Sequence, residues 1–205
     1  MGLTADRLKA SLDALGGIEP AFAAAIALIG YPAPRIRDRG YDTMLRAIVG
    51  QQVSIKAAAA ILAKVDATTG GAADPANVAA TSDEALRAAG LSRQKILYVK
   101  SLAEEVLDGR LDFHALPEED EAAIAAMTHV KGIGRWSAEV YLLFAEGRRD
   151  IFPAGDLAVQ VEIGRILGLP ARPTEKMVRE LAEPWRPHRG AAAIFAWHHR
   201  HVVPV

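Results

Sequence analysis

The feature that most constrains the fold is a helical periodicity that recurs along nearly the whole chain. Alanine-rich segments carry apolar residues at spacings of three and four, and no segment shows the sustained alternation of β-branched residues typical of a strand. The periodicity predicts helices over residues 5–15, 20–29, 42–49, 55–67, 82–89, 93–107, 118–126, 134–145, 157–167, 174–183 and 188–199. An all-α protein follows, and its 205 residues are enough to bury a core without a metal or a disulfide.

Two irregular stretches, residues 31–35 and 147–155, mark where we expect the chain to cross between subdomains. Both are rich in the proline or glycine residues that end helices. We therefore predict a discontinuous terminal lobe from residues 1–40 and 150–205, and a middle lobe of six helices from residues 41–149.

Composition excludes several classes of function. The chain contains no cysteine, which excludes disulfide scaffolds, thiol nucleophiles, cysteine-held zinc and thiolate-held iron–sulfur clusters. Its net charge of −1 gives no sign of the strongly basic character of many dedicated nucleic-acid binders. Residues 1–30 contain no apolar run long enough for a signal peptide or a membrane span, so we expect a cytoplasmic protein without membrane contact.

Basic residues nevertheless gather in two places, which we interpret as solvated surface. The first group comprises Arg35, Arg37, Arg39 and Arg46, and the second comprises Arg186, His188, Arg189, His198, His199, Arg200 and His201. The H-H-R-H run at 198–201 also has a spacing that zinc or nickel accepts. No acidic or cysteine residue lies nearby in the sequence, which favours a solvated basic tail.

A glycine motif lies between two predicted helices, in the segment M-T-H-V-K-G-I-G at 127–134. Residues 119–145 would then form two helices joined by a hairpin. Glycine permits positive φ and lets another molecule approach the backbone, and the amides that open the second helix suit an anion such as a phosphate. The alternative is a tight structural turn, in which Gly132 ends one helix and Gly134 starts the next.

Two further segments accompany this hairpin: I-V-G-Q-Q-V-S at 48–54 before it, and I-F-P-A-G-D at 151–156 after it. The chain ends in W-R-P-H-R-G-A-A-A-I-F-A-W at 185–197. In this order the motifs resemble those of the helix-hairpin-helix/GPD superfamily of DNA glycosylases. The resemblance is closest to the 3-methyladenine DNA glycosylase II (AlkA-like) branch, in a compact form lacking the N-terminal β domain. It implies a two-lobed, all-α fold with the active-site cleft between the lobes.

The resemblance implies that Asp156 is catalytic. Breaking an N-glycosidic bond takes the sugar through an oxocarbenium-like cation, which a carboxylate held in a water-poor pocket stabilises. Asp156 also directly precedes the predicted helix at 157–167, where an aspartate would cap the first turn. The two roles are compatible, because capping keeps the carboxylate ionised and oriented. We interpret the nearest rival carboxylate, Asp150, as a surface residue, and expect Arg189 to contact a phosphate or to pair with a buried acid.

The residue at the position of Trp136 distinguishes two kinds of reaction within the family. Members with a lysine at this position form a Schiff base with the sugar and cleave the strand, so a tryptophan implies release of the base alone, with water as the nucleophile. An indole face over a cationic alkylated base gains about 0.5–2 kcal/mol. We therefore place Trp136, Val140 and Tyr141 in the base pocket. The alternative is that Trp136 is a core residue packed on Val140 and Leu143.

The remaining candidate residues would contact DNA. A base inside the duplex must first leave the stack, and we assign Gln51 and Gln52 to filling the gap, with Gln52 as the wedge. The hairpin would hold the backbone through Lys131, Gly132, Gly134 and Arg135. In several relatives the hairpin also binds a monovalent cation, Na⁺ or K⁺, through main-chain carbonyls, which here would be those of Thr128, Val130 and Ile133.

The sequence therefore predicts a monofunctional DNA glycosylase that flips out and hydrolytically excises alkylated bases of the 3-methyladenine and 7-methylguanine type in base excision repair. The reaction requires no cofactor. We expect a monomer whose partner is double-stranded DNA with damaged bases, located at the nucleoid if the cell is bacterial. The two alternatives are a non-catalytic helix-hairpin-helix DNA-binding protein and a bifunctional glycosylase/lyase.

Overall fold

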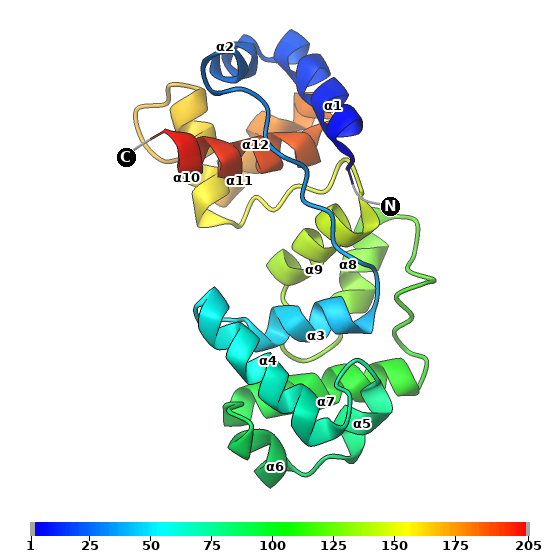
Figure 1. Ribbon diagram of the computed structural model, residues 1–205. Coiled ribbons are helices and arrows are strands. Elements are labelled where there is room, and N and C mark those ends of the chain that lie inside the picture. Colours follow the sequence, from blue (N-terminus) through cyan, green and yellow to red (C-terminus); the bar gives the residue numbers. More distant parts are fainter. Residues whose placement is uncertain (1–2, 204–205) are drawn as a thin grey trace. The chain divides into compact units, whose positions relative to one another are not determined.

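The computed structural model describes residues 3–203, and every regular element in this range is helical, as predicted (Figure 1). The α-helices are α1 (Ala5–Ile18), α2 (Pro20–Ile29), α3 (Tyr41–Val49), α4 (Ile55–Thr69), α5 (Pro75–Ala80), α6 (Asp83–Ala88), α7 (Arg93–Leu107), α8 (Asp120–Thr128), α9 (Arg135–Tyr141), α10 (Leu157–Ile166), α11 (Glu175–Ala182) and α12 (Arg189–Val202). A π-helical turn, Leu142–Glu146, continues α9, and a 3-10 turn, Glu183–Trp185, follows α11. No helix in the described range is long and apolar enough to cross a membrane.

Side-chain caps set many of the helix starts. Ser54, Ser82 and Ser92 each accept an amide of the first turn of their helix at 3.2 Å. Asp74 caps α5 in the same way, accepting the Ala76 amide at 2.9 Å. Helix α5 was not predicted, because its residues P-A-N-V-A-A show no apolar periodicity.

The chain folds as two compact units. The middle unit is Asp38–Ala138, and the terminal unit joins the helices before it to the segment from Glu139 onward. We expected the second crossing between residues 149 and 150, but it lies inside α9, and the predicted helix over 134–145 ends in the π-helical turn.

The second crossing comes early because the side chains after Glu139 belong to the core of the terminal unit. The Phe144 ring lies against Trp197 of α12, with ring centroids 5.6 Å apart. The Phe144 carbonyl also accepts the N–H of Arg37 at 3.0 Å, which ties the first crossing segment to the same place.

The core of the terminal unit forms around α12. Residues 190–196 of this helix are all buried, and the glycine and three alanines at 190–193 let neighbouring backbone come close. At Gly190 an added Cβ would lie 2.7 Å from the carbonyl oxygen of Arg149, which accepts the Gly190 amide at 2.9 Å. Phe22 of α2 meets Trp185 edge to face beside this helix, with centroids 5.1 Å apart.

A buried hydrogen bond joins α12 to α10. His199 is 8% exposed, and its Nδ1 lies 2.7 Å from Oε2 of Glu162, which is fully buried. Arg165 approaches the same carboxylate at 3.2 Å. The solvated tail that we predicted is therefore wrong for His199, because its acidic partner lies 37 positions earlier in the chain. Within residues 3–203 no cluster of acidic and histidine side chains is arranged to hold a metal ion.

An ion pair fixes the start of α12. Arg189 binds Asp150 through two contacts, Nε to Oδ1 at 2.9 Å and Nη2 to Oδ2 at 2.8 Å. Both side chains are largely buried. Of the two roles expected for Arg189, the structure shows the buried pairing, and Asp150 is not the surface residue that we predicted.

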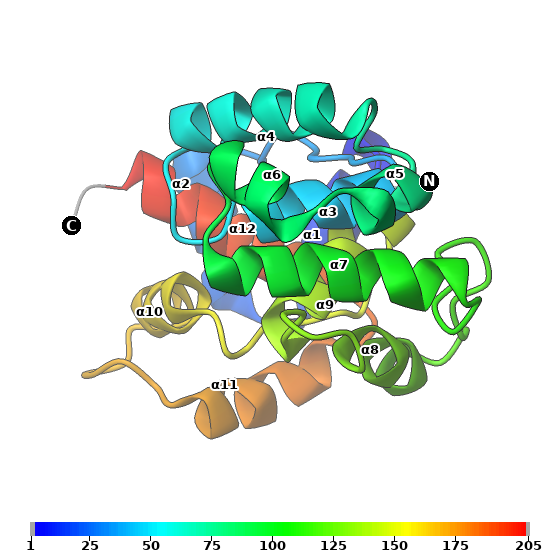
Figure 2. The same cartoon turned by 90° about the horizontal axis from the view of Figure 1, so that it is seen from below.

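Helix α7 is the centre of the middle unit, where it packs against α3, α5 and α6 (Figure 2). Its buried face carries Ile96, Val99 and Leu102, one helical turn apart along one side. Helix α4 completes this layer through contacts with α3, α5 and α6.

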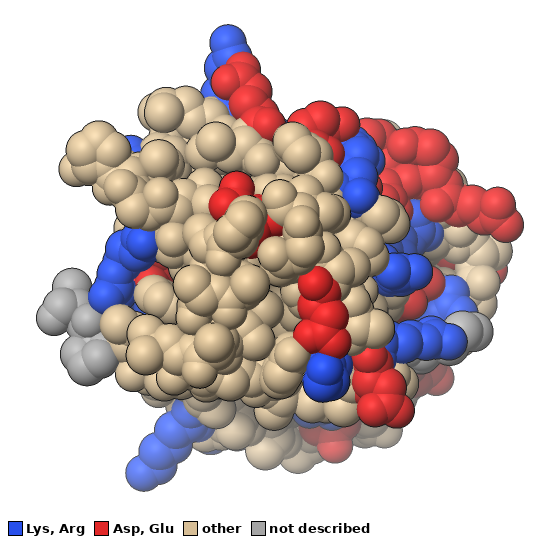
Figure 3. Space-filling view, turned by 90° about the horizontal axis from the view of Figure 1, so that it is seen from above, with Lys and Arg blue, Asp and Glu red and all other residues tan. Residues whose placement is uncertain are grey.

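The side of the terminal unit formed by α1 and α2 is largely uncharged. Much of the visible surface carries neither acidic nor basic groups, and charges of both signs are interspersed around it (Figure 3). The exposed apolar side chains Ile18 and Leu28 belong to these helices. A phosphate backbone is attracted by continuous positive charge, which this face does not offer among the described residues.

We expect Gly190→Ala to lower the free energy of unfolding by about 1–3 kcal/mol, because the new methyl group would overlap the Arg149 carbonyl and the Leu143 side chain. Gly17→Ala is the matched control, since no heavy atom lies within 4 Å of its added Cβ in α1, and it should be neutral or stabilising by about 0.5–1 kcal/mol. Urea unfolding of both variants checks this, and a Gly190→Ala protein as stable as its parent contradicts it.

Candidate active site

The hairpin between α8 and α9 holds two glycines with different roles. Gly132 has a φ of +89°, and an added Cβ would lie 2.2 Å from Cγ of Tyr98 on α7. Glycine is therefore required there by the backbone and by the Tyr98 ring. An added Cβ at Gly134 would meet no heavy atom within 4 Å, so the open approach expected from both glycines is found at Gly134.

The two basic residues of the hairpin differ in their surroundings. The guanidinium of Arg135 pairs with Glu121 of α8, Nη1 to Oε2 at 2.8 Å. The side chain of Lys131 is exposed, while its amide donates to Oγ of Ser101 at 3.3 Å. Lys131 is therefore better placed than Arg135 to bind an anionic ligand.

The structure separates the two glutamines after α3. Gln51 is half-buried, and its Nε2 donates to the carbonyl oxygen of Gly132 at 3.1 Å, which ties this loop to the hairpin. Gln52 has an exposed side chain and a φ of +56°, a conformation that a residue with a side chain rarely adopts. Gln52 thus projects from a strained position, whereas the carboxamide of Gln51 is occupied within the protein.

Lys95 of α7 contacts the end of α3, directly before this glutamine loop. Its Nζ donates to the carbonyl oxygen of Val49, the last residue of α3, at 2.6 Å. Partial burial lowers the pKa of the Lys95 ammonium. The roles of Lys95 and Tyr98 could not be predicted, because nothing in the periodicity of α7 indicates contacts with segments about 35–45 residues away in sequence.

Asp156 stands at the start of α10 as its N-cap. Its Oδ1 accepts the amide of Val159 at 3.0 Å and the indole N–H of Trp197 at 3.3 Å. The preceding loop is also fixed, because the buried Gln160 donates from Nε2 to the carbonyl oxygen of Ala154 at 2.8 Å. The side chain of Asp156 is therefore held in one orientation by two hydrogen-bond donors.

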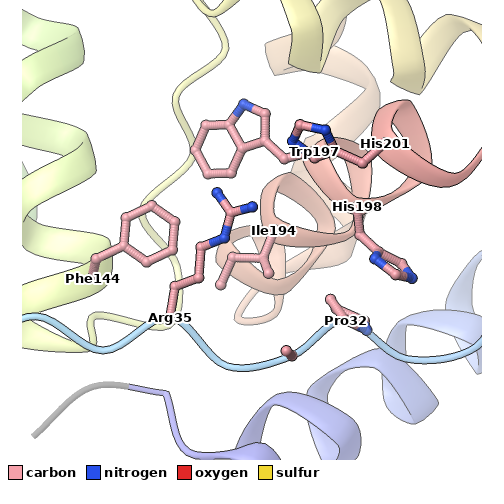
Figure 4. Close-up of a pocket in the computed structure, with 8 residues that line it drawn as sticks. Pro32, Arg35, Phe144, Ile194, Trp197, His198 and His201 are labelled. Atoms are coloured by element: carbon pink, nitrogen blue, oxygen red, sulfur yellow. The ribbon is translucent and has the colours of Figure 1, made fainter. Parts of the chain in front are cut away.

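Trp197 joins Asp156 to a pocket of about 310 Å³ in the terminal unit (Figure 4). Phe144 and Trp197 form an aromatic wall, and Arg35 reaches toward it from the extended segment after α2. None of these three residues was predicted to belong to a site. The motif at 185–197 ends at Trp197, and this was the one available signal.

The predicted base-pocket residues are distributed over both units. Trp136 lies near the end of the middle unit in sequence. Its side chain is 48% exposed, so it is not the core residue of the alternative interpretation. Val140 is partly exposed and Tyr141 is buried, and both follow the crossing and belong to the terminal unit, as does Asp156.

Comparison with known proteins gives a consistent result. A family model described as HhH-GPD superfamily base excision DNA repair protein matches residues 45–187. DNA-3-methyladenine glycosylase 1 of Schizosaccharomyces pombe is 32% identical over 190 residues, which cover 89% of this chain and 83% of that protein. The crystal structure of a DNA-3-methyladenine glycosidase from Bacillus halodurans matches with a TM-score of 0.85 at 32% identity, covering 92% of this chain and 88% of its own.

A 3-methyladenine DNA glycosylase of S. pombe, solved in complex with abasic DNA, matches with a TM-score of 0.80 at 30% identity. The match covers 94% of this chain and 97% of that one. Since the family model spans more than half of the sequence and the fold agrees over nearly all of it, the chain belongs to the HhH-GPD superfamily of base excision DNA repair proteins.

Proposed function

We propose that this protein is a monofunctional DNA glycosylase that hydrolyses the N-glycosidic bond of alkylated bases in base excision repair. The observation that carries the proposal is the fixed carboxylate of Asp156, held through Oδ1 by the Val159 amide and the Trp197 indole. The names of its relatives, DNA-3-methyladenine glycosylases, support alkylated purines as the substrate class.

The proposed reaction is a displacement at C1′ of the sugar. The bond to the base breaks and its electron pair leaves with the base, while the oxygen of a water molecule bonds to C1′ and gives up a proton. Asp156 lowers the barrier by placing a negative charge near the sugar cation that develops between these events. An orientation fixed before the reaction is what makes such stabilisation effective, because no reorganisation is then needed.

Release of the base without strand cleavage is supported by the residue at position 136. Trp136 stands where lyases of this family have their lysine, and an indole cannot form a Schiff base with the sugar. The exposed indole of Trp136 is suited to stack on a positively charged alkylated base, at about 0.5–2 kcal/mol. An alkylated base that is already cationic also leaves as a neutral molecule, so the site needs no general acid.

The proposed partner is double-stranded DNA with a damaged base, bound by a single copy of the chain. Gln52 would enter the duplex as the extruded base leaves it, and Gln51 would hold the loop against the hairpin. The phosphate backbone would lie at Gly134 and Lys131, where the hairpin is open and carries an exposed cation.

A monovalent cation in the hairpin remains a proposal. The oxygens offered would be the main-chain carbonyls of Thr128, Val130 and Ile133, and neutral oxygens suit hard cations such as Na⁺ or K⁺. The Val130 carbonyl already accepts the Ile133 amide at 3.1 Å, which leaves its second lone pair for an ion. The ion would add positive potential beside a phosphate and would take no part in breaking the bond.

Asp156→Asn tests the catalytic assignment. The amide oxygen still accepts from Val159 and Trp197, so the fold and DNA affinity should persist, while release of 3-methyladenine from methylated duplex DNA falls by at least about 100-fold. Single-turnover release measures the rate, and Asp6→Asn, an exposed position in α1, should match the parent. Excision by Asp156→Asn at the rate of the parent protein would contradict the catalytic assignment.

Gln52→Gly removes the wedge side chain while keeping a residue that accepts its positive φ. Because unstacking a paired base costs a few kcal/mol, we expect excision from a fully paired site to slow about tenfold or more, and excision from a mispaired or bulged site to slow less. Gln51→Ala should slow both substrates by similar factors, since it loosens the loop itself. Equal effects of Gln52→Gly on both substrates would exclude the wedge role.

Lys131→Ala tests the phosphate contact. The slope of log affinity against log salt for undamaged duplex DNA should become less steep by about one unit, as expected for the loss of one phosphate contact. Arg135→Ala should change the slope less, because the guanidinium of Arg135 is already paired with Glu121. Fluorescence anisotropy over a range of NaCl concentrations gives the slopes, and an unchanged slope for Lys131→Ala refutes the contact.

A further inference from the structure

Two basic clusters of the sequence, which the proposed function does not use, meet in one pocket of the terminal unit. Arg35 comes from the segment after α2, and His198 and His201 come from the end of α12. The volume of about 310 Å³ is at the lower end of the roughly 300–1,000 Å³ typical of small-molecule pockets. A pocket of this size suits one purine base better than a larger ligand.

Arg35 is the charged side chain that faces the aromatic wall of this pocket. Its guanidinium extends toward the indole of Trp197, with the ring of Phe144 beside it (Figure 4). The ring of His198 points away from Arg35, and its Nε2 lies 3.4 Å from the carbonyl oxygen of Ile29. A base stacked on the aromatic wall would therefore meet the donors of Arg35 at its edge.

Trp197 connects this pocket to the reacting sugar. Its indole N–H donates to Oδ1 of Asp156 at 3.3 Å, while its ring lines the pocket. A sugar held beside Asp156 thus places its base within reach of the wall formed by Trp197, and in this inference that wall takes the stacking role that was proposed for Trp136. We propose that Arg35 makes this pocket selective for purines that carry an oxo group at C6, an inference that rests on the proposed glycosylase function.

The chemistry of the guanidinium supports this assignment. Arginine has five N–H donors and no acceptor, so it requires an acceptor on the base. Hypoxanthine and 7-methylguanine present O6, and arginine is the residue that most often recognises the O6 edge of guanine. 3-Methyladenine has an amino donor at C6 and a positive charge in DNA, and both oppose a guanidinium. A charge-assisted hydrogen bond of this kind contributes about 10- to 100-fold in rate.

Three bases separate recognition of O6 from simple charge repulsion. Hypoxanthine and 7-methylguanine share O6 and differ in charge, whereas 7-methylguanine and 3-methyladenine share a positive charge and differ at C6. The variant is Arg35→Met, which keeps an apolar stem and removes the donors and the charge. Arg37→Met is the matched control, because Arg37 belongs to the same exposed segment and does not line the pocket, and its main-chain bond to Phe144 persists.

Single-turnover release is measured from a methylated duplex, in which 7-methylguanine and 3-methyladenine are separated by chromatography, and from a duplex with one deoxyinosine. In Arg35→Met we expect release of hypoxanthine and 7-methylguanine to fall about 10- to 100-fold, and release of 3-methyladenine to stay level or rise. Arg37→Met should excise all three bases like the parent.

Three results would overturn the selectivity proposal and leave the glycosylase function standing. The first is an equal loss on all three bases in Arg35→Met, which indicates a phosphate contact. The second is faster release of both cationic bases, which indicates charge repulsion alone. The third is a parent protein that excises 3-methyladenine but neither oxopurine. A parent that releases no base from any substrate contradicts the proposed function itself. Matching urea midpoints of Arg35→Met and its parent show that the comparison is between folded proteins.

Discussion

The close approach of α12 to its surroundings is the constraint on which the terminal unit depends. Glycine and alanine side chains along residues 190–196 bring this helix against the loop at Arg149, where even a methyl group would overlap a carbonyl oxygen. The same placement lets Trp197 reach Asp156 and His199 reach Glu162 on α10. The buried contact between His199 and Glu162 and the contact between Trp197 and Asp156 therefore both depend on one tightly packed helix.

In the middle unit a close approach also depends on glycine, at the single position Gly132. The Tyr98 ring occupies the place of a side chain at Gly132, and the Gly132 carbonyl accepts from Gln51. Lys95, one turn before Tyr98 on α7, holds the end of α3 at Val49. Helix α7 thereby positions both the hairpin and the loop that carries Gln52. A change on the buried side of α7 would disturb the two proposed DNA contacts together.

A feature could be predicted from the sequence when the residues that determine it lie close together along the chain. Most helices follow from local periodicity and caps, whereas α5 shows no apolar periodicity, and the end of α9 is decided by where its side chains are buried. The N-cap role of Asp156 is confirmed, and it could be predicted because a cap depends only on the residues next to it. Trp197, Arg35 and the partner of His199 were missed or misassigned, because their roles arise from residues far apart in sequence.

In the proposed reaction the two charged groups would act on opposite sides of the bond that breaks. Asp156 would act on the sugar, where positive charge develops whatever the base, and this would be sufficient when the base is cationic and leaves as a neutral molecule. A neutral 6-oxopurine leaves with additional negative charge, part of which resides on O6. A guanidinium donating to O6 stabilises that charge as it forms, so the contact proposed for Arg35 would assist departure as well as binding. Selectivity at C6 and activation of the leaving group are then two results of the same hydrogen bond.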